Sequence, residues 1–200
     1  MWLTRLLGGP RSASPAELES FLGRHGAFVA QKTVLDYCRV KAGRQERMLF
    51  ADPEFRAALD HCRWQTFGAA VADLCGLAEA WLRPHAAGAE QRLAGALAGI
   101  GARILDAAEA PPAERPDLDA TAATLPAHLA RLQAAPPRPL HRRPLLAEAP
   151  LLATLPIHPD QRIGETPSIT GALRFHVIAC QQEMERAFDA PGLAAALLAR

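Results

Sequence analysis

The stretch from Asp52 to Pro84, DPEFRAALDHCRWQTFGAAVADLCGLAEAWLRP, predicts a long helix around which the rest of the chain is organised. Asp52 is a residue type that caps the free N–H groups at a helix start, and Pro53 fits the first helical turn. Pro84 disfavours helical geometry in Arg83, so we expect the helix to end there. About thirty residues lie between these marks, which corresponds to roughly 45 Å of helix.

This helix has no clearly polar side. One apolar stripe alternates steps of three and four residues, and the opposite side is mostly small or apolar. A helix that is apolar nearly all round is normally buried by several neighbours. A membrane span needs about twenty residues almost free of charge, but Asp73 and Glu79 interrupt the candidate Thr66–Leu82. We therefore expect a buried helix of a protein without a transmembrane segment. The stripe comprises Trp64, Phe67, Val71, Leu74, Ala78 and Trp81.

The composition is that of a globular protein. Of the 200 residues, 50% are hydrophobic and 22% are charged, and a chain of this length suits one domain with a substantial core. The formal net charge of +1 gives no electrostatic case for binding nucleic acid or an anionic membrane. Twenty arginines stand against two lysines. We interpret this imbalance as the bias of a GC-rich, bacterial genome.

The cysteines predict a reducing, cytoplasmic compartment. Cys38, Cys62, Cys75 and Cys180 show neither CxxC nor metal-ligand spacing. Each falls on an apolar helical face, where a free cysteine behaves as a small buried hydrophobe. The first residues, MWLTRLLGGPRS, lack an apolar run of the length that a signal peptide needs.

The whole chain predicts an all-α fold, a helical bundle of five to six helices around the long central helix. Residues 1–13 are expected to form an N-terminal tail, and residues 14–200 a single helical domain. Ser14 and Pro15 start a helix that is expected to break or bend around His25, between two glycines. Further helices are predicted over 27–42, 89–108, 118–134, 166–189 and 191–200.

Two of these helices carry an ambiguity. Pro126 predicts a restart or kink within 118–134. The piece 173–180, LRFHVIAC, is rich in apolar and β-branched residues, so a strand is the alternative there.

A proline-rich segment over 135–166 cannot form one regular element. Interleaved apolar residues distinguish it from a polar linker, so we expect it to wrap over the bundle as a crossover and to insert leucines into the core. Loops of this length inside compact domains are uncommon unless they are functional or mobile. The interleaved residues are Leu145, Leu146, Leu151, Leu152, Leu155 and Ile157.

The chain lacks the common sequence motifs of catalysis. Phosphate-binding GxGxxG and GxxxxGK[ST] patterns, the GxSxG nucleophile elbow and the HExxH zinc signature are all absent. The sequence therefore predicts no catalytic residue, no metal ligand and no particular cofactor, and it leans away from an enzyme.

The best candidates for a ligand-binding site are polar groups near the central helix. His61 and Gln65 stand one turn apart at the border between its two apolar sides. If the crossover folds over this helix, His158 and Glu165 meet that pair, and His176 joins them from the last long helix. Histidines beside carboxylates can carry out acid–base chemistry or bind a metal. The structural alternative assigns the same residues to a turn, a surface pair and the core.

Three functions fit these observations. The first is a non-enzymatic helical interaction protein, such as an adaptor, regulator or assembly factor, which binds a protein partner or a second copy of itself through an apolar groove. The second is a small-molecule-binding or metal-binding helical protein, including an enzyme, with a His-containing polar pocket. The third is a membrane-peripheral protein in which Met1–Leu7 makes a weak surface contact.

Overall fold

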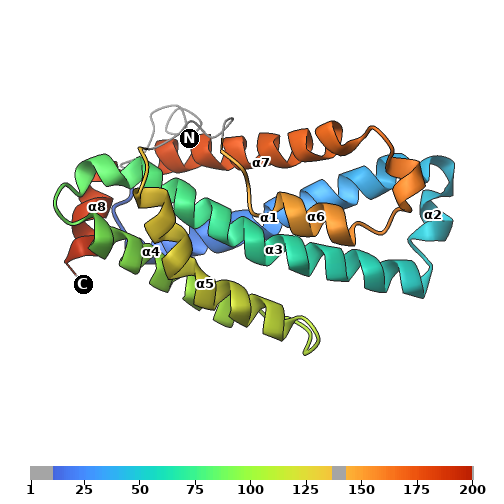
Figure 1. Ribbon diagram of the computed structural model, residues 1–200, viewed down its shortest axis with the longest axis horizontal. Helices are drawn as coiled ribbons and strands as arrows, with labels where there is room; N and C mark the ends of the chain where they lie inside the picture. Colours follow the sequence, from blue (N-terminus) through green and yellow to red (C-terminus); the bar gives the residue numbers. More distant parts are fainter. Residues whose placement is uncertain (1–10, 137–142, 200) are drawn as a thin grey trace, which may run out of the picture.

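The computed structural model describes residues 11–136 and 143–199, and this part of the chain is all-α (Figure 1). The helix predicted over 173–180 is confirmed, because these residues lie inside one continuous helix. The segment Met1–Leu7 lies outside the described residues. The helices are α1 (Pro15–Ala42), α2 (Glu46–Leu49), α3 (Pro53–Leu82), α4 (Glu90–Asp106), α5 (Arg115–Gln133), α6 (Glu148–Thr154), α7 (Thr166–Ala187) and α8 (Ala190–Leu198).

The predicted central helix is α3. Asp52 caps it as expected, since its Oδ1 accepts hydrogen bonds from the N–H groups of Glu54 at 2.8 Å and Phe55 at 3.1 Å. Every residue from Ala70 to Glu79 is buried, because α1, α4, α5, α6, α7 and α8 all pack against α3. In Figure 1, α7 runs along one side of the α1–α3 pair, and α4 and α5 lie on the other side. No described helix is long and apolar enough to cross a membrane.

The expected break around His25 is wrong, because α1 runs without interruption through Gly23 and Gly26. Gly26 serves packing instead: a Cβ atom there would lie 2.7 Å from Cγ2 of Val71 on α3. A glycine costs a helix at most about 1 kcal/mol relative to alanine. Close contact between two buried helices outweighs that cost.

Helix α5 differs from the prediction at two points. It begins at Arg115, three residues earlier than expected, with Pro116 in the first turn, where a missing N–H costs nothing. It also continues as one helix through Pro126, whose side chain is exposed. The loss of one hydrogen bond there is tolerated because Leu125 and Leu129 on either side are buried in the core.

The described part of the proline-rich crossover packs against the bundle, as the sequence predicts, and its main contact is with α3. From Arg143 onward the chain packs against α3 and forms α6, a short helix that the proline content did not predict (Figure 1). Leu145, Leu151, Leu155 and Ile157 are buried, whereas Leu146 is 41% exposed. The crossover therefore contributes to the core at most of its leucines and leaves one at the surface.

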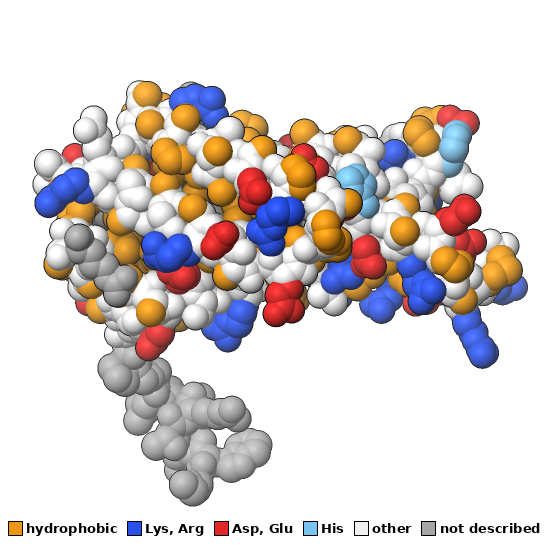
Figure 2. All heavy atoms as spheres, turned by 90° about the horizontal axis from the view of Figure 1, so that it is seen from below, with side chains coloured by type: hydrophobic (Ala, Val, Ile, Leu, Met, Phe, Trp, Pro, Cys, Tyr) orange, Lys and Arg blue, Asp and Glu red, His pale blue; other side chains and the backbone are white. Residues whose placement is uncertain are grey.

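Charges of both signs are mixed on the surface. On the face shown in Figure 2, Lys and Arg side chains alternate with Asp and Glu side chains, and neither sign gathers into a continuous patch. This pattern agrees with the formal net charge of +1.

Candidate functional site

His61 and Gln65 meet a buried carboxylate that the sequence analysis did not single out. Nδ1 of His61 lies 2.7 Å from Oε1 of Glu114, and Nε2 of Gln65 donates to Oε2 of Glu114 at 3.0 Å. Gln65 also donates to Asp117 at 2.7 Å. Glu114 is the residue immediately before α5, so these contacts fasten the start of α5 to α3. The His61 side chain is 48% exposed, which leaves the site open to water.

Glu165 lies at the end of α1 rather than near His61. Its carboxylate accepts hydrogen bonds from the Tyr37 hydroxyl at 2.5 Å and from Nζ of Lys41 at 2.8 Å. These two bonds lower the pKa of Glu165, while burial and the bond to Glu165 raise the pKa of Tyr37. Lys41 also donates to the carbonyl oxygen of Gln161 at 2.6 Å. This cluster holds the turn before α7 against α1.

The other two predicted histidines have contacts of their own. The His158 side chain is 68% exposed, and its Nδ1 accepts a hydrogen bond from the N–H of Asp160 at 3.3 Å, which forms a turn. The His176 ring packs edge-on against Phe28 and Phe175, with centroid distances of 5.7 and 5.6 Å. Burial lowers the pKa of His176.

The contacts therefore join His61 to Gln65 and join neither residue to His158, Glu165 or His176. The crossover reaches α3 on a different side from the one that was expected. The Cys62 thiol faces it, 3.9 Å from the carbonyl oxygen of Leu151. His61 points toward the start of α5 instead. The common pocket proposed from the sequence required the crossover to cover His61. The crossover covers other residues of α3 instead.

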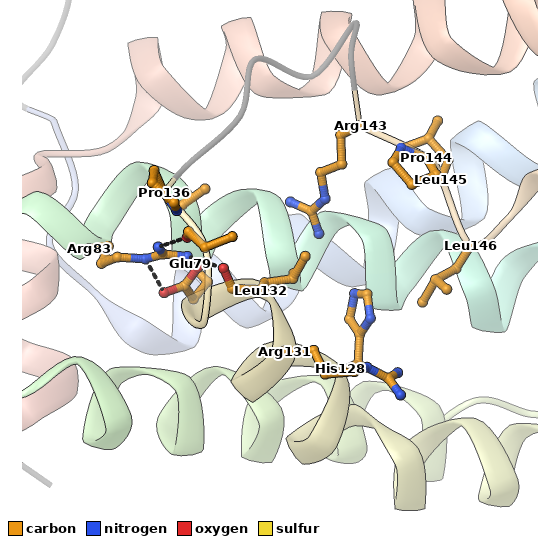
Figure 3. A pocket seen from close by; sticks show the side chains of 12 residues that line it. Glu79, Arg83, His128, Arg131, Leu132, Pro136, Arg143, Pro144, Leu145 and Leu146 are labelled. Atoms are coloured by element: carbon orange, nitrogen blue, oxygen red, sulfur yellow. Dashed lines mark hydrogen bonds and ion pairs between the residues drawn. The ribbon is translucent and has the colours of Figure 1, made fainter.

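A cavity of about 370 Å³ lies where the crossover passes over α3 and α5 (Figure 3). Its size is at the lower end of the range for small-molecule sites. We call it the crossover pocket. It is lined from α3 and the residue after it by Glu79, Ala80 and Arg83, from α5 by His128, Arg131 and Leu132, and from the crossover by Ala135, Pro136, Arg143, Pro144, Leu145 and Leu146.

One wall of the crossover pocket is a satisfied ion pair. Glu79 is fully buried, and its carboxylate accepts two hydrogen bonds from Arg83, at 2.8 and 2.7 Å. Nε2 of Gln133 donates to the same carboxylate at 2.9 Å. Arg83 also donates to the carbonyl oxygens of Leu132 and Ala135, at 3.1 and 2.9 Å. The charge of Glu79 is thus neutralised, and the end of α5 is fixed to α3.

A second buried acid, Asp73, anchors the crossover. Its two carboxylate oxygens accept hydrogen bonds from the N–H groups of Leu146 at 2.9 Å and Ala147 at 3.0 Å, just before α6. Burial raises the pKa of Asp73 to about 6, against the opposing effects of these two bonds and of the nearby Arg143. Asp73 therefore fastens the backbone immediately before α6 to α3.

Arg143 projects from the crossover toward α3. It is 8% exposed, and its Nη1 donates to the carbonyl oxygen of Gly76 at 2.9 Å. The guanidinium lies close to the backbone of Gly76, because a Cβ atom at position 76 would collide with Nη2 of Arg143 unless that side chain shifted. Arg174 of α7 donates to the carbonyl oxygen of Arg143 at 2.7 Å, which fixes the backbone from the other side. Nη2 itself is buried and has no hydrogen-bond partner among the described residues.

His128 faces the same space from α5. It is 9% exposed, and its buried Nε2 has no hydrogen-bond partner among the described residues. Burial lowers the pKa of His128 to about 4, and the charges of Arg143 and Arg131 act in the same direction. The ring is therefore uncharged at neutral pH. Figure 3 shows the His128 ring and the Arg143 guanidinium pointing toward one another.

Two unpaired nitrogens in one cavity are unusual, because buried polar atoms are nearly always hydrogen-bonded. An uncharged imidazole in its Nε2–H tautomer and a guanidinium are both donors. The arrangement can hold an oxygen atom of a ligand between them. The sequence did carry a signal for this region: Asp73 and Glu79 interrupt an otherwise apolar buried helix. Their partners in the crossover and in α5 could not be identified from the sequence.

A further polar cluster joins α1 to α7. The Cys180 sulfur lies 3.3 Å from Nδ1 of His25, and Nε2 of His25 lies 3.2 Å from Glu183. This order matches a nucleophile, a base and an orienting acid. However, Cys180 is buried, and burial raises the pKa of its thiol to about 12 while it lowers the pKa of His25. The thiol is therefore unactivated, and we assign the cluster to packing.

All four cysteines are free and buried, as the sequence predicts. Within residues 11–136 and 143–199, no group of three or more His, Cys, Asp or Glu side chains is placed to hold a metal ion. Comparisons of the chain with protein-family models, with curated proteins and with solved structures find no match, so the geometry of the crossover pocket carries the functional argument.

Proposed function

We propose that the protein binds a small, partly apolar molecule in the crossover pocket. The observation that carries this proposal is a pair of buried nitrogens, Nε2 of His128 and Nη2 of Arg143, which have no hydrogen-bond partner among the described residues and belong to two residues that line one cavity. An unsatisfied buried donor costs roughly 1–3 kcal/mol. A bound molecule that accepts hydrogen bonds from both nitrogens removes that cost.

The rest of the lining also suits a small molecule. Leucine, proline and alanine side chains make up most of the wall, with a few polar groups among them, and that mixture is typical of ligand sites. The Glu79–Arg83 pair and the Asp73 contacts hold α3, α5 and the crossover together without using the two free nitrogens. The elements around the pocket are thus held in place before a ligand binds, which lowers the entropic cost of binding.

The proposal concerns binding and not catalysis. Of the described residues that line the pocket, the one carboxylate, Glu79, is occupied by Arg83 and Gln133. Among the described lining residues, no acid is hydrogen-bonded to His128 to orient it as a general base, and none is a Ser, Cys or Lys nucleophile.

The test uses 1-anilinonaphthalene-8-sulfonate, an anionic aromatic dye whose fluorescence rises in apolar sites. We expect the dye to bind the wild type with a saturable, one-site increase in fluorescence. The variant Ala80→Trp, which fills the pocket, should abolish the increase. The matched control Phe175→Ser removes an exposed aromatic ring on α7 and should leave it unchanged. Near-UV circular dichroism verifies that each variant keeps native packing. Loss of the signal in Phe175→Ser alone would refute the proposal, as would no signal in the wild type.

A second candidate function is protein–protein interaction through the outer face of α1 and α7. Phe28 and Phe175 are 47% and 68% exposed, and both rings pack against His176 between them. Exposed aromatic rings are enriched at protein interfaces. This observation favours the adaptor, regulator or assembly-factor function expected from the sequence, with a protein partner or a second copy of the chain on this face.

The mass of the protein in solution tests this second candidate for self-association. We expect light scattering to show a dimer that dissociates in the double variant Phe28→Ser/Phe175→Ser. The variant Val40→Ser, which removes another exposed apolar side chain of α1, is the control and should leave the mass unchanged. A wild type that stays monomeric at high concentration counts against self-association.

A further inference from the structure

We infer that the ligand of the crossover pocket is a monocarboxylate with an apolar body, its carboxylate held by Arg143 and His128. This inference rests on the proposed function and deepens it by naming the chemical class of the ligand. It follows from the charge balance of the pocket, the number of free donors and the apolar wall.

The charge balance favours a single negative charge. Glu79 and Arg83 neutralise each other. Arg143 is buried, and the oxygens of the nearest acids are occupied: those of Asp73 by backbone N–H groups, and those of Glu79 by Arg83 and Gln133. The charges of Asp73 and Glu79 act on Arg143, but neither carboxylate is hydrogen-bonded to its guanidinium. A buried guanidinium without a hydrogen-bonded counterion is costly. One carboxylate on Nη2 supplies that counterion.

With His128 in its Nε2–H tautomer, the free donors match a carboxylate in number. A carboxylate has two oxygens, and the pocket offers two unpaired nitrogens on opposite walls, one from α5 and one from the crossover (Figure 3). A phosphate monoester brings three terminal oxygens and up to two charges, which would need more donors. The remaining space is lined by apolar side chains such as Leu132 and Leu145. They accept an alkyl or aromatic body.

The experiment measures calorimetric binding of four probes with one body and different heads: octanoate, octanol, octylamine and octyl phosphate, each below its micelle concentration. We expect octanoate to bind the wild type at least about tenfold more tightly than octanol, because a hydrogen bond to a charged group is worth roughly that factor or more. Octylamine should bind most weakly, since its ammonium meets Arg143. Octyl phosphate should bind less tightly than octanoate.

Variants of Arg143 and His128 test whether each residue binds the head group of the probe. In Arg143→Met the octanoate advantage over octanol should vanish, while octanol binding stays within about twofold. His128→Phe should reduce octanoate binding about fivefold. The matched controls Arg103→Met and His176→Phe change the same residue types outside the pocket and should have no effect. If Arg143→Met does not fold, Gly76→Ala displaces the guanidinium without removing its charge and should weaken octanoate binding.

The outcomes separate this inference from the proposed function. Equal binding of octanoate and octanol, tighter binding of octyl phosphate, or unchanged octanoate affinity in both Arg143→Met and Gly76→Ala would overturn the carboxylate while leaving a pocket that binds the fluorescent dye. If no octyl probe binds and the protein causes no increase in the fluorescence of the dye, the proposed function fails as well.

Discussion

Helix α3 carries two polar sites, and they differ in how their charges are satisfied. Toward its N-terminal end, His61 and Gln65 hold Glu114, and His61 keeps contact with water. Toward its C-terminal end, Asp73 and Glu79 are buried and hold the crossover and the end of α5. Next to them the crossover pocket has two nitrogens without a hydrogen-bond partner in the part of the chain that the structure describes.

The difference shows why the more conspicuous residues are the poorer candidates. A histidine at the border of an apolar helix is easily picked out in a sequence as a candidate site residue. In the structure, Glu114 and the access of water to the exposed ring satisfy the hydrogen-bonding groups of His61. An acid inside an apolar run looks like an interruption. Its burial forces other groups to converge on it, and the converging elements enclose a cavity. The buried acids of α3 thus mark the site better than its histidine does.

The largest expected effect is on stability at the two glutamates. Glu79→Ala should lower the free energy of unfolding by about 3–5 kcal/mol, because it leaves Arg83 without its partner in a largely buried position. Glu114→Ala should cost only about 1–2 kcal/mol, since His61 can turn to water. Urea unfolding of both variants measures the difference. Similar losses would remove the distinction between the two sites.

The pH dependence of stability gives a second contrast, within the pocket region. The pKa of Asp73 is raised to about 6. The contribution of Asp73 to the free energy of unfolding is therefore complete below about pH 4 and is lost as the pH rises through 6. The pKa of His128 is lowered to about 4. The contribution of His128 to the free energy of unfolding is complete above about pH 6.5 and is lost as the pH falls through 4. In the wild type the two trends oppose each other.

Two variants separate these trends. Relative to the wild type, Asp73→Asn should become more stable as the pH rises from 4 to 6, by up to about 2–3 kcal/mol, because the destabilising ionisation is gone. His128→Gln should show the opposite slope over the same window. Urea unfolding at several pH values measures both. His61→Gln, which changes a histidine at the open site, serves as the control. Equal slopes in Asp73→Asn and His128→Gln would contradict the burial of these groups.

The two glycines of α3 offer a smaller test. A Cβ at position 76 would collide with Arg143 and would lie 2.7 Å from Cδ1 of Leu132, so two side chains must move, whereas one at position 68 would lie 2.9 Å from Cδ2 of Leu118 alone. We expect Gly76→Ala to cost about 1–3 kcal/mol. Gly68→Ala should stay within about 1 kcal/mol, because alanine is the better helix former. Thermal unfolding ranks the two. A larger loss for Gly68→Ala would show that the contact with Arg143 is not the tighter one.

The smallest effect is expected at His61. His61→Ala removes one hydrogen bond from an open site, and the bond from Gln65 to Glu114 remains. We expect a loss of about 0.5–1 kcal/mol, read from the same urea titration, and no change in octanoate binding. A loss comparable to that of Glu79→Ala would make the open site as important as the buried one.

The sequence by itself determined the all-α class, the central helix and its cap at Asp52, since capping and apolar periodicity are local properties. It also predicted the packing of the crossover leucines. It misplaced the break near Gly26, because the gain that keeps α1 straight comes from Val71, 45 positions away. Helical signals in the sequence report the intrinsic conformational propensity of a segment. They do not report the packing contacts that the segment makes with other helices.

Only the tertiary structure decided where the candidate site lies. Asp73, His128 and Arg143 come from α3, α5 and the crossover, and no spacing in the sequence relates them. Which carboxylate oxygens are occupied, and which nitrogens are left free, depends on where the crossover passes over α3. Hydrogen bonds and buried charges depend on distances of a few ångströms, and packing sets these distances between residues far apart in the chain.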